Sequence, residues 1–128
     1  MEGYSASSYD FANNNGGVHI MDERIKTIAD DYLEKLRSVD EYVAYKDELN
    51  MLERFPDLMT RVDAYRAENF AIQSRFEGDE LYDKVEELQN RYDDILSDGR
   101  VSNFLHAESN FCRMIQEVNQ YIVEGLDI

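Results

Sequence analysis

Few side chains in this sequence could act as nucleophiles or metal ligands. The chain holds one cysteine, Cys112, and two histidines, His19 and His106. A single cysteine excludes an internal disulfide and a zinc site built from several cysteines of one chain. His106 and Cys112 stand six residues apart on one expected helix, so their side chains leave it on different sides and do not form a nucleophile–base pair. We interpret Cys112 as a buried, inert thiol and His106 as a surface or helix-contact residue.

Carboxylates are abundant, but their spacing does not suit catalysis. Identical acidic pairs stand at 30–31 and 93–94 (Asp-Asp) and at 86–87 (Glu-Glu), and neighbouring residues on a helix point in different directions. We interpret these pairs as solvated helix surfaces. The sequence lacks a Glu-x-x-His pair, a His-Glu-x-x-His motif, a phosphate-binding glycine-rich loop and a nucleophile elbow. These features predict a protein that is not an enzyme and needs no metal or cofactor.

Polar residues inside apolar helical stripes are the more informative feature. In the segment 101–122 apolar residues recur three and four apart, and Glu108 takes a position where this spacing calls for an apolar side chain. Asn69 and Asn119 occupy comparable positions in their own stripes. A polar residue in a packing seam costs stability unless its hydrogen bonds are satisfied.

Three interpretations of Glu108 follow from this position. It could end the buried strip and reach solvent, or it could pair inside the protein with a tyrosine hydroxyl or an arginine. It could also set the register or make a contact at a subunit interface. Phe104, Phe111 and Ile115 surround it in the stripe, which favours the second and third interpretations together over the first. The arginines considered for such a pairing are Arg61, Arg66 and Arg91.

The elements that would position these residues are helices. Ser38 and Glu41 fit a capping box, and Pro56 fits the first turn of a helix. Gly78 and Gly99 fit helix ends. No strand pattern is convincing, so the sequence predicts an all-α antiparallel bundle of about five helices. Apolar residues recur at helical spacing over 25–36, 42–52, 58–76, 81–95 and 101–122.

The last three stripes keep the alternating three–four spacing of helices that pack nearly parallel, as in coiled coils. Such long C-terminal helices could close a core within one chain or share one across a dimer, and we expect a dimer. The predicted core or interface residues are Tyr42, Tyr45, Tyr65, Phe104, Phe111, Ile115, Val118 and Ile122.

Composition divides the chain into a tail and one domain. Residues 1–20 are rich in Ser, Asn and Gly and contain no Lys or Arg, which predicts a disordered N-terminal tail before a helical domain over 21–128. The chain holds 28 acidic and 13 basic residues, for a net charge of -15. That charge opposes direct nucleic-acid binding and docking on anionic membranes. No segment has the length of a membrane span or the pattern of a signal peptide, so we expect a cytoplasmic protein.

The segment around Glu108 also carries a resemblance to a known family. VSNFLHAESNFCRMIQEVNQYI resembles the C-terminal signature of the YlbF/YmcA family of small bacterial helical proteins, which includes YheA. SVDEYVAYKDELNML resembles a second family segment, and FPDLMTRVDAYR resembles the helix start that follows it. The resemblance covers residues 22–124 of the chain. The residues of the C-terminal signature are Val101, Phe104, Ala107, Glu108, Val118, Asn119 and Ile122.

The resemblance implies an all-helical protein that forms a homodimer or a heteromer with family relatives. It also implies a non-catalytic regulatory adaptor of Gram-positive bacteria, linked to competence, sporulation or biofilm formation through a complex that steers ribonuclease Y in mRNA processing. It makes Glu108 a structural or interface acceptor, with Ala107 small enough to admit another helix. One alternative is a YheA-like protein of unknown role without a ribonuclease link. A less favoured alternative is a small metal-binding bundle.

One departure from the ribonuclease-linked relatives concerns cysteine. Some of those relatives carry extra cysteines associated with iron–sulfur clusters, whereas this chain has Cys112 alone. One thiolate cannot supply the four protein ligands that such a cluster takes. A cluster would have to be shared with a partner, and we expect none.

Overall fold

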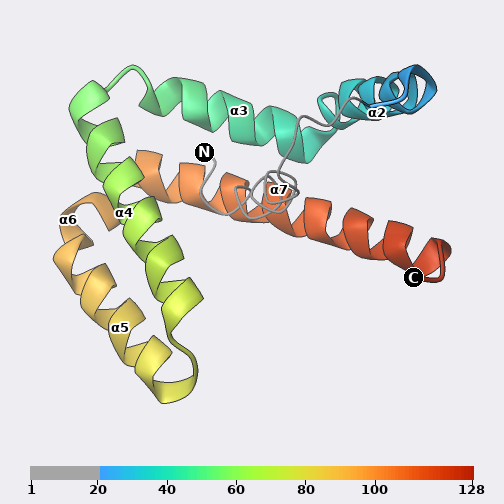
Figure 1. Ribbon diagram of the computed structural model, residues 1–128. Helices are drawn as coiled ribbons and strands as arrows, with labels where there is room; N and C mark the ends of the chain where they lie inside the picture. Colours follow the sequence, from blue (N-terminus) through green and yellow to red (C-terminus); the bar gives the residue numbers. More distant parts are fainter. Residues whose placement is uncertain (1–20) are drawn as a thin grey trace.

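The computed structural model describes residues 21–128, and the predicted N-terminal tail over 1–20 lies outside them. Within the described residues the chain is helical apart from its turns, which confirms the all-α prediction. The helices form two antiparallel pairs that meet at one corner (Figure 1). In chain order they are α2 (Glu23–Leu36), α3 (Asp40–Leu52), α4 (Pro56–Arg75), α5 (Gly78–Arg91), α6 (Asp93–Leu96) and α7 (Gly99–Gly125).

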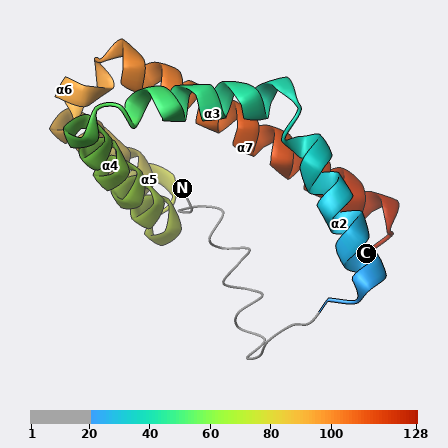
Figure 2. The same ribbon diagram turned by 90° about the horizontal axis from the view of Figure 1, so that it is seen from above.

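The first pair consists of α3 and the N-terminal half of α7, which run side by side in opposite directions (Figures 1 and 2). Aromatic rings make much of the contact. Tyr45 stacks on Phe111 with ring centroids 5.5 Å apart, and Tyr42 meets Phe111 edge-on at 5.4 Å. Tyr45 also lies 5.9 Å from the ring of Phe104. Because α3 has 13 residues and α7 has 27, α3 covers only about half of α7.

The second pair consists of α4 and α5, which project from the first pair as an arm (Figures 1 and 2). Pro56 occupies the first turn of α4, as predicted. The chain reverses between the two helices through Gly78, whose φ of 65° lies in the left-handed region that glycine adopts without strain. The single turn of α6 then leads to α7.

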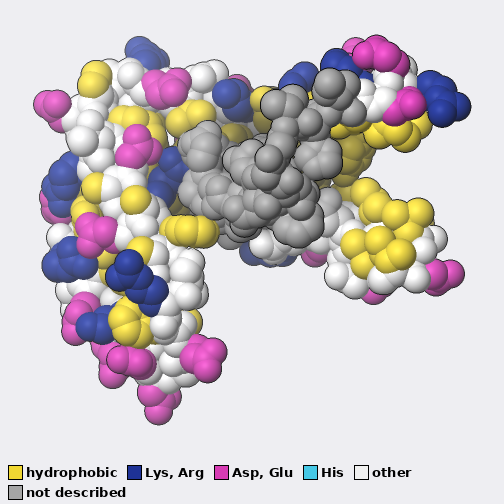
Figure 3. Space-filling model, in the orientation of Figure 1, with side chains coloured by type: hydrophobic (Ala, Val, Ile, Leu, Met, Phe, Trp, Pro, Cys, Tyr) yellow, Lys and Arg dark blue, Asp and Glu magenta, His cyan; other side chains and the backbone are white. Residues whose placement is uncertain are grey.

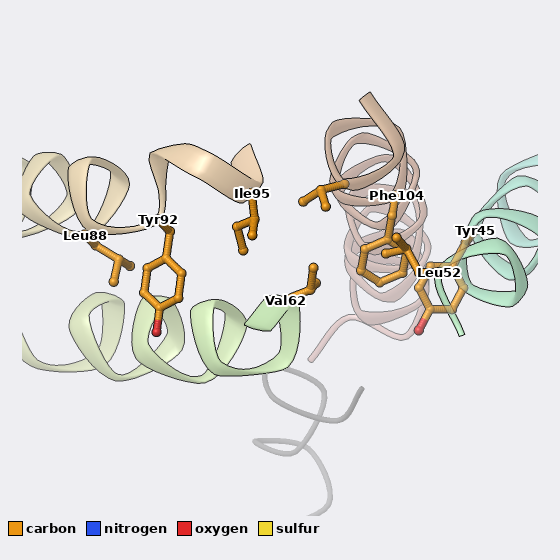
Figure 4. Packing of buried hydrophobic residues seen from close by; sticks show 8 residues of the cluster. Tyr45, Leu52, Val62, Leu88, Tyr92, Ile95 and Phe104 are labelled. Carbon is orange, nitrogen blue, oxygen red and sulfur yellow. The ribbon is translucent and has the colours of Figure 1, made fainter. Parts of the chain in front are cut away.

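A row of buried apolar side chains joins the two pairs (Figure 4). We call it the junction. Five of its side chains, Leu52, Val62, Leu88, Val101 and Phe104, have no exposed surface. Burying side chains of this size contributes about 1.5–3 kcal/mol each. The junction therefore fixes how the arm and the N-terminal half of α7 are oriented. In order from the arm to α3, the row shown runs through Leu88, Tyr92, Ile95, Val62, Phe104, Leu52 and Tyr45.

Several helix boundaries differ from the sequence prediction. Gly78 and Gly99 open α5 and α7 instead of ending the helices before them. Asp98 makes the second of these starts possible, because its carboxylate accepts a hydrogen bond from the Arg100 N–H at 2.9 Å. Ser38 does not cap α3, because its hydroxyl donates at 2.7 Å to a carbonyl in the last turn of α2.

The predicted helix over 81–95 is also interrupted, at Tyr92, into α5 and α6. The backbone leaves helical geometry there, with φ -109° and ψ 19°. The break allows the Tyr92 ring to lie against α4, where it meets Tyr65 edge-on at 5.5 Å. The spacing of apolar residues is continuous through this segment, but packing against α4 has interrupted the helix.

α2 and the end of α7 stand outside the junction. No residue of α2 is buried, although Ile25 and Ile28 belong to the predicted apolar stripe. On α7 every residue from Asn119 onward is exposed. Figure 3 shows hydrophobic atoms of α2 and of the α7 end on the two sides of an open notch. No helix within 21–128 is both long and apolar enough for a membrane crossing.

Candidate functional site

Glu108 lies in a polar contact between α7 and α4. Its side chain is 10% exposed, and Arg66 donates a hydrogen bond to its Oε2 at 2.5 Å. The Arg66 side chain is 15% exposed and also donates to Asp63 at 3.1 Å. Of the three interpretations offered for Glu108, the structure contains the pairing with an arginine. A buried carboxylate is thus compensated by an almost equally buried guanidinium.

The position of Arg66 follows from helix geometry. Phe104 and Glu108 are four residues apart on α7, so they lie on one face, one turn apart. The Arg66 guanidinium sits over the Phe104 ring at 5.3 Å from its centroid and reaches the carboxylate beyond it. The charges of Arg66 and Glu108 also affect the pKa of Tyr45. Burial raises the pKa of the Tyr45 phenol, Arg66 lowers it in part, and Glu108 raises it further.

A groove of about 400 Å³ opens between α4 and α7 beside this ion pair. It brings together Asn69 and Glu108, two of the polar residues that the sequence singled out. Cys112 also lines it and is half-buried, so the prediction of a buried thiol was wrong. Asn119 is elsewhere, exposed on the end of α7.

A second groove of similar volume lies between α3 and α7. Ala107, which is 8% exposed, and Ala44 are its apolar lining residues, so the small side chain at 107 lies where α3 approaches α7. His106 is exposed on the wall of this groove, as a residue at a helix contact. Within residues 21–128, no group of three or more His, Cys, Asp or Glu side chains is arranged to hold a metal ion.

The sequence missed a polar cluster on the arm. The Tyr92 hydroxyl donates to Glu68, which also pairs with Arg91 at 2.9 Å. Arg61 donates two hydrogen bonds to Asp94, at 2.7 and 3.1 Å. Arg61 and Arg91 were considered as partners of Glu108, and each has another carboxylate instead. Arg61 and Asp94 are 33 residues apart, and no local signal connects them.

This cluster perturbs its own acid–base groups. The Tyr92 hydroxyl and then Arg91 lower the pKa of the Glu68 carboxyl. The hydrogen bond to Glu68, followed by burial, raises the pKa of Tyr92. Arg61 lies over the same tyrosine ring at 5.3 Å from its centroid. The arrangement clamps α4 to α5 and α6 with charged hydrogen bonds.

The predicted apolar residues fall into a gradient of burial. Phe104 has no exposed surface and Tyr45 is 4% exposed, so both belong to the junction. Ile122 is 42% exposed and belongs to the end of α7. The residues between these extremes are half-buried: Tyr42, Tyr65, Phe111, Ile115 and Val118.

Together these features define an all-α protein with a buried arginine–glutamate pair at its centre and apolar helix surfaces at its periphery. The chain belongs to the YlbF/YmcA family, since residues 25–127 match the family model described as control of competence regulator ComK, YlbF/YmcA. The match begins in α2 and ends after α7, so the exposed helices are part of the family domain. The family description supports a regulatory role for this chain.

A curated relative is similar over much of the domain. UPF0342 protein SSP0954 of Staphylococcus saprophyticus subsp. saprophyticus is 28% identical over 94 residues, which cover 72% of this chain and 82% of that protein. No solved structure matches the chain.

Proposed function

We propose that this chain is a non-catalytic adaptor of the cytoplasm that regulates through protein–protein contacts. Family membership supports the regulatory role, and exposed apolar surface supports the mechanism. Large apolar patches at a protein surface mark interaction sites. Here the exposed large apolar side chains concentrate on α2 and at the end of α7. They include Ile25, Ile28, Tyr32, Leu33, Tyr121, Ile122, Val123, Leu126 and Ile128.

The partners that we propose are copies of this chain or family relatives, acting with ribonuclease Y in mRNA processing that affects competence, sporulation or biofilm formation. A net charge of -15 disfavours direct contact with RNA. An adaptor of this kind would therefore act on the ribonuclease and leave RNA binding to that enzyme.

A crosslinked pull-down of the tagged full chain from its own cells, read by mass spectrometry, tests the proposal. We expect ribonuclease Y and family relatives to be recovered. Leu126→Lys, at a side chain 63% exposed on the end of α7, should reduce their recovery, because a charge would be buried at the contact. Tyr82→Lys is the matched control, since Tyr82 is 71% exposed on α5.

The same experiment distinguishes the adaptor proposal from the alternative, which is a YheA-like protein of unknown role with no ribonuclease link. Recovery of the chain by itself, together with unchanged transcript processing in a strain that lacks it, would contradict the adaptor proposal. Equal loss of partners in both lysine variants would contradict the assignment of the contact to the end of α7.

A further inference from the structure

We propose that the groove between α3 and α7 binds a basic amphipathic helix of a partner protein. The proposal rests on the adaptor function and names the chemistry of one partner contact. Three features of the groove support it, namely small side chains at its base, an acidic wall, and a methionine that continues it on each helix. Its central residues are Glu41, Ala44 and Glu48 on α3, and Asn103, Ala107 and Asn110 on α7.

The shape of the groove suits a third helix. Ala44 and Ala107 line a space of about 400 Å³ between the two antiparallel helices, and small side chains at a contact let helix axes approach to about 8 Å. Ala107 faces this groove, whereas Ser109 borders the groove beside α4. The two residues are about 200° apart around α7. An incoming helix would therefore reach α3 and α7 without meeting the arm.

The α3 wall of the groove is acidic. Asp40, Glu41 and Glu48 line it, and Glu48 is half-buried. Within residues 21–128 none of these three carboxylates has an ion pair or a side-chain hydrogen bond. The nearby Lys46 lies two residues from Ala44, on the opposite side of α3. Lysine or arginine side chains of a partner would complement this wall.

The acidic wall distinguishes a foreign partner from a second copy of this chain. Among the described helices none has a net positive charge, and the most basic, α4, holds three basic and three acidic residues. Residues 1–20 contain no Lys or Arg. A second copy and the N-terminal segment therefore lack a cationic helix for this wall, whereas a basic helix of another protein has one.

A methionine continues the groove on each helix. Met51 follows Ala44 by seven residues and Met114 follows Ala107 by seven, so each lies on the same side of its helix as the alanine. Met51 is 40% exposed and Met114 is half-buried. Because α3 and α7 are antiparallel, the two methionines stand at opposite ends of the groove. Methionine adapts to irregular apolar partners and is frequent at protein-binding surfaces, so the occupant should be apolar at both ends of the contact.

The groove also predicts the sequence pattern of its occupant. Glu41 and Glu48 are seven residues apart, about 10 Å along α3. A helix beside α3 would match them with two Lys or Arg residues seven apart and with small residues between. Apolar residues beyond the two cations would reach Met51 and Met114. An amphipathic helix of this pattern would lay one face into the groove, a common mode of peptide recognition.

Fluorescence anisotropy with a designed peptide tests the groove. The probe is a fluorescein-labelled helix of about 18 residues, long enough to be helical in water. It is built from alanine and glutamine, with two lysines seven residues apart and a leucine beyond each on the same face. We expect it to bind the full chain, and Glu41→Gln/Glu48→Gln to weaken binding by about tenfold. Ala44→Leu should weaken binding at least as much, because the larger side chain fills the base of the groove.

Each variant has a matched control. Glu80→Gln/Glu87→Gln removes the same charge from two exposed carboxylates of α5 that are also seven residues apart. Ala64→Leu adds the same side chain at an exposed alanine of α4. At about 0.15 M salt, where distant exposed charges are screened, both controls should change the affinity by less than about twofold. A peptide of the same composition with one lysine on the opposite face should bind about fivefold more weakly.

Photo-crosslinking in cells identifies the natural occupant. Benzoylphenylalanine is placed at position 103, which is exposed on the α7 wall of the groove. It should crosslink a segment of another protein that carries Lys or Arg residues seven apart. The same group at position 82, on α5, should not capture that segment. Crosslinks from position 103 to a second copy of this chain, or to residues 1–20, would overturn the proposal.

Other outcomes would also overturn it. Equal weakening by the α3 and α5 variants would mean that the peptide is attracted to acidic surface in general. Unchanged affinity in Ala44→Leu would mean that the peptide binds outside the groove. A peptide that does not bind, while the pull-down recovers ribonuclease Y, contradicts the groove proposal and leaves the adaptor function standing. Binding in the groove, with no partner recovered, contradicts the adaptor function and leaves the groove proposal standing.

Discussion

Phe104 and Ile122 lie on the same face of α7, yet Phe104 has no exposed surface and Ile122 is 42% exposed. The spacing of apolar residues is the same around both. What differs is the neighbour, since α3 and α4 cover the first half of α7 and no other helix within residues 21–128 covers the second. A helical stripe thus predicts that a contact exists, whereas the lengths of the neighbouring helices indicate whether the same chain provides it.

The two regions also treat charge differently. A buried ion pair, Arg66–Glu108, lies beside the junction, with both side chains at most 15% exposed. On α2 the ion pairs are exposed, with all four side chains of Lys26–Asp30 and Lys35–Asp31 more than half exposed. Removing a charge from the Arg66–Glu108 pair beside the junction should therefore lower stability, whereas removing one from α2 should have little effect.

The largest effect is expected from Phe104→Ala. Phe104 is fully buried between α3 and α4, and removing a buried phenyl ring costs about 3–5 kcal/mol of unfolding free energy. Urea denaturation at one fixed protein concentration measures it. Tyr82→Ala, at a side chain 71% exposed, should change stability by less than about 0.5 kcal/mol. Similar losses in both variants would remove the distinction between junction and surface.

Glu108→Ala should follow, with a loss of about 3 kcal/mol, because it removes the buried carboxylate partner of Arg66 and leaves that guanidinium with the exposed Asp63 carboxylate. The double variant Arg66→Met/Glu108→Leu should recover most of that loss, since an apolar pair of similar volume often replaces a buried ion pair without cost. Thermal and urea denaturation of the unsubstituted chain, of Glu108→Ala and of the double variant measure these stability changes. An unchanged melting temperature and unchanged oligomer size in Glu108→Ala would show that the pair is not structural.

A smaller effect is expected at the start of α7, where Arg100 lowers the pKa of the Asp98 carboxyl to about 2, first through its side chain and then through its N–H. The folded-state pKa lies below the unfolded value, so Asp98 stabilises the fold above about pH 4 and this contribution is lost as the pH falls toward about 2. Asp98→Asn should therefore make the unfolding free energy depend less on pH between about pH 4 and about pH 2. NMR titration of the carboxyl checks the pKa, and a normal value would contradict the assignment.

The smallest effect is expected from Ile25→Ala on α2. Ile25 is 54% exposed, so the unfolding free energy of the monomer should change by less than about 0.5 kcal/mol. The measurement is urea denaturation at concentrations where the chain sediments as a monomer. A loss above about 1 kcal/mol would mean that α2 packs on its own chain, and the contrast with the junction would fail.

Much of the fold could be predicted from the sequence because apolar periodicity is local information. The same pattern selected Phe104 and Tyr45, which are buried in the structure, and Glu108, which is a buried polar residue. It could not choose among Arg61, Arg66 and Arg91, because that choice depends on how α4 and α5 are placed relative to α7. The break at Tyr92 was missed for a related reason, since its cause is a ring contact with Tyr65 on another helix.

The residues at which helices begin and end were harder to predict than the face of each helix that is buried. Gly78 and Gly99 can end a helix or precede one, and their local sequences do not distinguish these uses. Asp98 shows what decided one case, because its carboxylate accepts the Arg100 N–H and so opens α7. Ser38 was equally ambiguous, since a serine between two helices can close the first or cap the second.

α7 is one uninterrupted helix from Gly99 to Gly125, and this has a consequence for how its length can vary. Each added residue rotates everything after it by about 100°. One residue inserted near Met114 would turn Ile122 away from its face while leaving Phe104 in place. Seven inserted residues would shift the rotational phase by only about 20° and lengthen the helix by about 10 Å. The length of α7 can therefore change by about seven residues at a time without turning the α7 end out of alignment with the junction. A change of a single residue would lose that alignment.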